Sequence, residues 1–188
     1  FRTPLGDVPV DRATIAALDT RGIEVFEPSH QYEHSLEVHL PFLQAVLDDF
    51  QLVPIVVGVC PAGEVASVLE ALWGGDETLI VISSDLSHYH DYNTARQLDQ
   101  ATSQAIEQLD PRSIDGEHAC GCRPLNGLLT LAKQKGMSAS VIDLRNSGDT
   151  AGSSTFQRLG HLASIVVGQP DVEEHMDMMP GRVDVCDH

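Results

Sequence analysis

An apolar run that ends in a dense polar cluster constrains the fold of this sequence more than any other feature. Residues 78–82 (TLIVI) are typical of a strand buried inside a sheet. The cluster follows at once and consists of Ser83, Ser84, Asp85, Ser87, His88 and His90. Open α/β sheets carry their chemistry at the carboxyl ends of buried strands. The segment therefore predicts either a functional site at a sheet edge or a plain polar turn with surface histidines.

Asp85 and His88 are the candidate catalytic pair of this segment. They stand three residues apart, so the carboxylate can orient the imidazole. An imidazole acts as base, acid or metal ligand near neutral pH.

The rest of the chain alternates between strand and helix patterns, which predicts an α/β fold with a mixed β-sheet flanked by helices. One domain is expected over residues 1–168, and residues 169–188 are expected to form an acidic, flexible tail. Helices are expected at 11–18, 33–47, 61–73, 93–109 and 124–135; further strands at 23–26, 52–59, 139–144 and 161–167; and a Gly/Ser-rich loop at 146–154.

The charge balance narrows the choice of partners. The formal net charge is -17, and the only lysines are Lys133 and Lys135. Such a surface repels nucleic acid and anionic membranes, so neither is expected as a partner. No apolar run approaches the roughly 20 residues of a membrane span. The four cysteines match neither a disulfide scaffold nor a paired zinc motif, which favours a reduced, cytoplasmic protein.

Three histidines, His30, His34 and His39, fall within ten residues and stand beside Glu33 and Glu37. If a helix begins at Glu33, His34 and Glu37 share one face and His39 does not. A single histidine here is more often a surface or capping residue than a ligand. Three together with two carboxylates favour a ligand role more strongly.

A thiol cluster precedes the predicted helix at 124–135. Cys120 stands ahead of Gly121, and the positive end of the helix dipole favours its thiolate form. A thiolate suits a soft metal ligand or a nucleophile. The alternatives are a buried, inert Cys120, or Cys122 as the reactive thiol. Asn146 and Asp149 lie in a segment that is either a loop on the active side or an ordinary glycine turn.

Common catalytic fingerprints are absent from the sequence. No G-x-S-x-G elbow surrounds Ser83 and Ser84, which argues against a serine hydrolase of that type. No P-loop and no G-x-G-x-x-G segment occurs, so nucleotide binding has no support.

Taken together, these segments resemble the MEMO family, whose microbial members are often called AmmeMemoRadiSam system protein B. The matching stretches occur in the family's order and reach to about Gly168. They are residues 3–7 (TPLGD), 33–43 (EHSLEVHLPFL), 83–88 (SSDLSH), Cys120 and Gly121 before a proline-led helix, and 146–149 (NSGD).

The resemblance implies a fold similar to the class III extradiol dioxygenases, which hold non-haem iron. By residue matching, His34 and Cys120 correspond to metal ligands, and His88 to an acid/base group with Asp85 beside it. The expected cofactor is Fe(II) or copper, with zinc less favoured. The residues expected to bind substrate are Glu37, Ser84, Asn146 and Asp149.

One departure from the family affects this expected site. Family members usually carry a Pro-His-Ala-Gly segment that supplies a first histidine ligand, and nothing in this sequence matches it. We therefore expect N-terminal elements of the family to be missing, and the sheet to lack one or two strands or to pair with another chain. Only two candidate ligands remain, unless His30, His90 or His118 supplies a third.

The leading functional hypothesis is a metal-dependent redox enzyme of dioxygenase type. Because a thiolate replaces the carboxylate of related oxygenases, reduction of O2 is at least as well supported as ring cleavage. The alternative is a non-catalytic adaptor that uses the same cleft, and a zinc hydrolase is a third hypothesis. The family name implies radical-SAM and AMMECR1-type partner proteins, and assembly into a homo-oligomer is left open.

Overall fold

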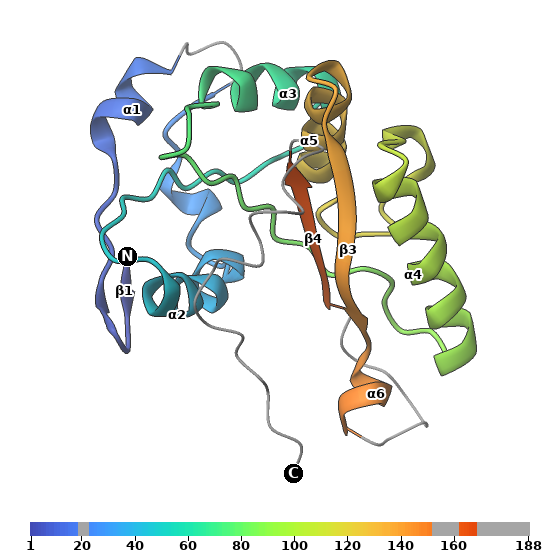
Figure 1. The fold of residues 1–188 in the computed structure, drawn as a ribbon. Coiled ribbons are helices and arrows are strands. Elements are labelled where there is room, and N and C mark those ends of the chain that lie inside the picture. The colour runs from blue at the N-terminus through green and yellow to red at the C-terminus, as the bar shows by residue number, and fades with distance from the viewer. Residues whose placement is uncertain (19–22, 152–161, 169–188) are drawn as a thin grey trace.

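Helices alternate with extended segments along the chain. The computed structural model describes residues 1–18, 23–151 and 162–168 (Figure 1). The helices are α1 (Arg12–Ala17), α2 (Ser35–Val46), α3 (Ala62–Ala71), α4 (Tyr92–Glu107), α5 (Cys122–Gln134) and α6 (Ser147–Ala151). The strands are β1 (Arg2–Thr3), β2 (Gly6–Asp7), β3 (Ser138–Arg145) and β4 (Leu162–Gly168). Two short 3-10 helices are also present in the described residues, η1 (Glu27–Ser29) and η2 (Pro111–Ser113).

All five helices predicted from the sequence are present, as α1 to α5. Local chemistry sets their ends. Asp91 caps α4 by accepting hydrogen bonds from the backbone N–H groups of Asn93 and Thr94, each at 3.1 Å. Asp11 caps α1 in the same way through Thr14, at 2.9 Å. Such caps satisfy donors that have no partner inside the helix.

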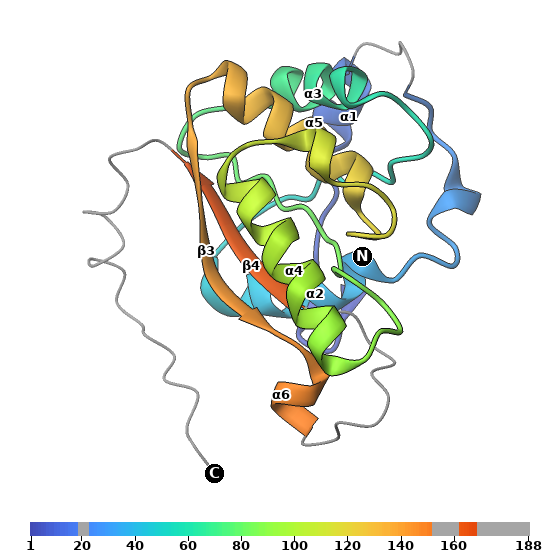
Figure 2. The same cartoon turned by 90° about the vertical axis from the view of Figure 1, so that its right-hand side faces the viewer.

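The two sheets are small and antiparallel. β1 and β2 form a hairpin, and β3 pairs with β4 from Ser138 opposite Gly168 to Arg145 opposite Leu162. The predicted strands at 139–144 and 161–167 are therefore confirmed. α4 packs on β3, while β1 and α2 lie on the other side of the β3–β4 pair (Figures 1 and 2).

Two apolar clusters meet along α5. One joins α5 to α4 and the loop before α5, and it includes Ile106, Ala119 and Leu129. The other joins α5 to α3 through Val65 and Leu128. Ala119 is fully buried, and this burial anchors the loop that carries Cys120.

Three predicted strands are wrong. Residues 23–26 and 78–82 have no strand partner in the described part of the chain, and within 52–59 only Leu52 forms a bridge, to Val10. Ile80 and Ile82 pack against the α3–α5 cluster, whereas Leu79 and Val81 stay 65% and 48% exposed. The apolar composition suits a strand covered on both faces, but a strand also needs a neighbour to form a ladder.

The predicted mixed sheet is accordingly replaced by an α/β arrangement with small antiparallel sheets. The expected loop at 146–154 contains the short helix α6, and the expected tail at 169–188 lies outside the described residues. Among the described helices, none is long and apolar enough to cross a membrane.

A glycine permits the closest approach between α3 and α5. A Cβ at Gly127 would lie 2.5 Å from Cβ of Val65, which is too close for two carbon atoms. We expect Gly127→Ala to lower the free energy of unfolding by about 1–3 kcal/mol, because the helices must separate. Chemical denaturation measures this change.

The matched control is Gly63→Ala in α3, where an added Cβ meets nothing within 4 Å. It should be neutral or stabilising by up to about 1 kcal/mol, since alanine favours the helix. Equal stability of the two variants would contradict the close approach.

Candidate metal centre

Two loops far apart in the sequence bring three ligand-type side chains together. Asp85 and His88 come from the loop before α4, and Cys120 comes from the loop before α5. One ligand atom of each lies within 4.8 Å of those of the other two. In the part of the chain that the structure describes, this is the only group of three or more His, Cys, Asp or Glu residues with that geometry.

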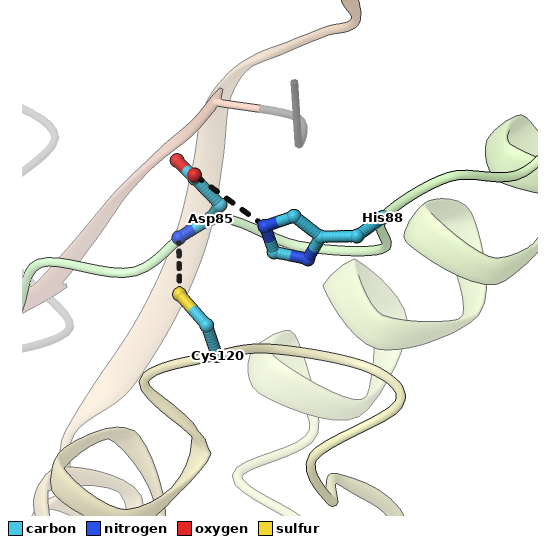
Figure 3. A group of neighbouring side chains, drawn as sticks. All are labelled: Asp85, His88 and Cys120. Atoms are coloured by element: carbon cyan, nitrogen blue, oxygen red, sulfur yellow. Dashed lines mark hydrogen bonds and ion pairs between the residues drawn. The ribbon is translucent and has the colours of Figure 1, made fainter. Parts of the chain in front are cut away.

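Asp85 and Cys120 are joined by reciprocal hydrogen bonds. The backbone N–H of Asp85 donates to Sγ of Cys120 at 3.2 Å, and the backbone N–H of Cys120 donates to the carbonyl of Asp85 at 3.2 Å. Nε2 of His88 lies 3.6 Å from Oδ2 of Asp85 (Figure 3). The Asp85 backbone thus holds the sulfur in place, while its carboxylate faces the imidazole.

Ser84 ties the two loops together through its hydroxyl. Its Oγ donates to the carbonyl of Asp85 at 2.7 Å and accepts from the backbone N–H of Gly121 at 2.9 Å. The same oxygen lies 3.8 Å from Sγ of Cys120. Ser84, predicted to bind substrate, therefore stands inside the centre as a neighbour of the thiol.

Two consecutive buried residues between Asp85 and His88 fix the direction of these ligands. Leu86 and Ser87 are buried, and the backbone N–H of Ser87 donates to Oδ1 of the buried Asp99 at 2.9 Å. The flanking side chains of Asp85 and His88 remain 52% and 31% exposed. An incoming ion or substrate can therefore reach them without opening the core.

The donor set suits a transition metal. Thiolate and imidazole are ligands for iron, copper and zinc, and a carboxylate is accepted by iron and zinc. Cys120 stands two residues before α5, next to the N-cap residue Gly121.

Other residues predicted for the site lie elsewhere. His34 is the N-cap residue of α2, its side chain is 87% exposed, and its contact is with Glu33 at 4.0 Å. It is not part of the three-residue group, so its pairing with Cys120 stays a prediction. Glu37 lies exposed in the first turn of α2.

Asn146 and Asp149 line a different feature. They border a cavity of about 240 Å³ together with Arg96 and Asp99, beside α4 and the end of β3. Asp149 accepts a hydrogen bond from the hydroxyl of Tyr92 at 2.6 Å, which raises the pKa of Tyr92 and lowers the pKa of Asp149. Asp85, His88 and Cys120 are not among the residues that line this cavity.

The three histidines considered as a possible third ligand are not part of the group formed by Asp85, His88 and Cys120. They are His30, His90 and His118. His30 lies at the end of η1, and His90 is half-buried just before α4. Nδ1 of His118 instead lies 2.7 Å from Oδ1 of Asp115 in its own loop.

Sequence reasoning missed two contributors to the centre. Asp85 was expected only to orient His88, yet its backbone also binds the sulfur of Cys120. Gly121 is required by a close approach, since a Cβ there would lie 2.6 Å from the carbonyl oxygen of Ser83. The Cys-Gly dipeptide before a predicted helix could have indicated that Gly121 matters. No spacing rule, however, links residues 85 and 120.

Comparison with known proteins identifies the family of the chain. The family model for "Memo-like protein" matches residues 1–162. The chain therefore belongs to the Memo-like protein family, as the sequence motifs predicted.

Several archaeal relatives are similar over most of the chain. A MEMO1 family protein of Saccharolobus solfataricus is 36% identical over 180 residues, covering 87% of this chain and 63% of the relative. A MEMO1 family protein of Methanosarcina barkeri is 35% identical over 179 residues, covering 88% and 67%. The chain thus spans about two thirds of the length of these relatives.

Gly121→Ala tests how the two loops meet. Gly121 has φ -89°, which alanine tolerates, so the cost arises from the added Cβ against Ser83 and Ser84. We expect the free energy of unfolding to fall by about 1–3 kcal/mol. Gly116→Ala, in the same loop, meets nothing within 4 Å and serves as the control. A stability for Gly121→Ala that equals the control would refute the tight contact.

Asp115 gives a pH dependence with a defined sign. The hydrogen bond with His118 is the largest cause that lowers the pKa of Asp115 from its ordinary value of 3.8. A lowered pKa stabilises the fold above pH 3.8, and this stabilisation is lost as the pH falls further. We expect Asp115→Asn to be less stable than the wild type near pH 6, and the difference to shrink below pH 3.8.

Urea denaturation at a series of pH values measures this difference. Asp76→Asn, an exposed aspartate in the turn after α3, is the control. A difference between wild type and Asp115→Asn that does not change with pH would show that the carboxylate charge is not its cause.

Proposed function

We propose that this protein is a non-haem, metal-dependent redox protein similar in fold to the class III extradiol dioxygenases. The observation that supports it is the convergence of Asp85, His88 and Cys120, whose ligand atoms lie within 4.8 Å of one another. A thiol, an imidazole and a carboxylate are ligand types that transition metals bind in proteins.

In this proposal the protein residues have distinct roles. Cys120 is the thiolate ligand, positioned by the backbone N–H of Asp85. His88 is either a second ligand or the group that moves a proton, and the Asp85 carboxylate at 3.6 Å orients its imidazole. His34 is retained from family matching as a further ligand. Iron or copper, when bound, supplies one-electron redox chemistry that side chains lack.

The family name adds a setting to this proposal. We propose radical-SAM and AMMECR1-type proteins as its partners, and a modification system as its setting. The relatives are longer than the matched region, so the activity and partners of the whole protein belong to the same proposal.

Metal content tests the proposal directly. The protein is purified anaerobically, loaded with Fe(II) or Cu(I), desalted and measured by elemental analysis. We expect near-stoichiometric metal in the wild type, and affinity lowered at least about tenfold by Cys120→Ser and His88→Ala. His34→Ala separately tests the ligand taken from family matching.

Two matched substitutions control for general damage. Cys60→Ser and His30→Ala alter the same residue types outside the group. Loss of metal in these controls, or its retention in Cys120→Ser, would sink the assignment. Proton transfer by His88 predicts a different pattern, in which His88→Ala binds metal but loses oxygen consumption with a reductant.

A non-catalytic binding protein is the second candidate. It is supported by the apolar side chains of Leu79, Val81 and Val59, which the described part of the chain leaves exposed. This function predicts partner binding that is unaffected by a chelator and by Cys120→Ser.

A further inference from the structure

We propose that His39 is a positioning residue of the metal centre and acts through Ser83. The inference rests on the proposed function of that centre. The sequence groups His39 only with His30 and His34 as possible ligands, and its spacing gives no link to Ser83.

The contact that supports this proposal joins two distant parts of the chain. Nε2 of His39 lies 2.9 Å from Oγ of Ser83, and the residues are 44 positions apart. Both residues are half-buried. A hydrogen bond at such a site is shielded in part from competing water and constrains both groups.

His39 is carried by a firmly placed helix. The next residue, Leu40, is only 1% exposed, so α2 is anchored in the interior at this turn. One turn further along, Gln44 forms a hydrogen bond with Thr3 of the β1–β2 hairpin. The imidazole therefore extends from a helix that is anchored at the next residue and again one turn further along.

Ser83, in contrast, lies at the end of a segment that lacks a ladder. Residues 78–82 have no strand partner in the described part of the chain. No strand ladder in the described part of the chain sets where this segment ends, so side-chain contacts contribute to its position. The hydrogen bond to His39 supplies such a contact immediately before Ser84 and Asp85.

A shift of Ser83 reaches the sulfur through direct contacts. The carbonyl oxygen of Ser83 lies against Gly121, where a Cβ would be only 2.6 Å away. Ser84 binds the backbone N–H of Gly121, and Asp85 binds Sγ of Cys120. Loss of the His39 hydrogen bond should therefore loosen the reciprocal bonds between Asp85 and Cys120.

The experiment uses two readouts on the full chain. The first is titration with Co(II) alone, followed through the thiolate-to-cobalt absorption band, which reports ligation by sulfur. The second is hydrogen exchange of the Asp85 amide in the metal-free protein, measured by NMR. The second readout needs no metal, so a failed proposal for the metal site would not hide the result for His39.

The variants separate the hydrogen bond from the bulk of the ring. His39→Ala and Ser83→Ala remove the bond, whereas His39→Gln and Ser83→Thr keep a polar group that can make it. We expect the first two to weaken Co(II) binding and to speed Asp85 exchange, each about fivefold. His39→Gln and Ser83→Thr should restore values near the wild type.

The controls are His30→Gln and Ser67→Ala. Ser67 donates a hydrogen bond to the Gly63 carbonyl within α3, so its loss matches the chemistry of Ser83→Ala away from the centre. Unchanged Asp85 exchange in His39→Ala and Ser83→Ala would overturn the proposal, and so would equal changes in the controls. Absence of Co(II) binding in the wild type, with faster Asp85 exchange in both variants, would refute the metal site and leave the positioning role of His39 standing.

Discussion

The reciprocal hydrogen bonds between Asp85 and Cys120 are the interaction on which the candidate centre depends. They join two segments that α4 separates along the chain. Their strength depends on the core, because burial of Ala119 and Leu86 holds the residues next to the two ligands. The ligands are thereby exposed, yet each is attached to a buried neighbour. This combination gives a reactive site fixed geometry as well as access.

Close packing around a glycine occurs both between two helices and between the two loops of the site. Gly127 lets α3 approach α5 and so sets the position of the helix that follows Cys120. Gly121 then lets the loop before α5 lie against Ser83 and Ser84. A side chain at either position would push apart elements that must touch for the three ligand atoms to gather. The packing of the helices and the geometry of the site therefore both depend on close contacts that only glycine allows.

Helices were predicted well and strands less well, for a physical reason. Asp11 and Asp91 cap their helices through bonds to residues two or three positions away, so local sequence is sufficient. A strand requires a partner that spacing along the chain does not reveal. The run at 78–82 has the composition of a buried strand, and Ile80 and Ile82 do face a core cluster. Its other face and its edges have no partner among the described residues.

The sequence by itself determined the family, the helices, and the pairing of Asp85 with His88, because a spacing of three residues in one loop keeps two side chains near each other. Only the tertiary structure decided that Cys120 joins them, that Ser84 and Gly121 hold the loops together, and that His39 reaches Ser83. It also placed Asn146 and Asp149 beside a cavity that Asp85, His88 and Cys120 do not line. The hydrogen bond of Gly121 with Ser84 joins residues 37 positions apart, and that of His39 with Ser83 joins residues 44 positions apart. Their distances in space follow from how helices pack, which no local pattern records.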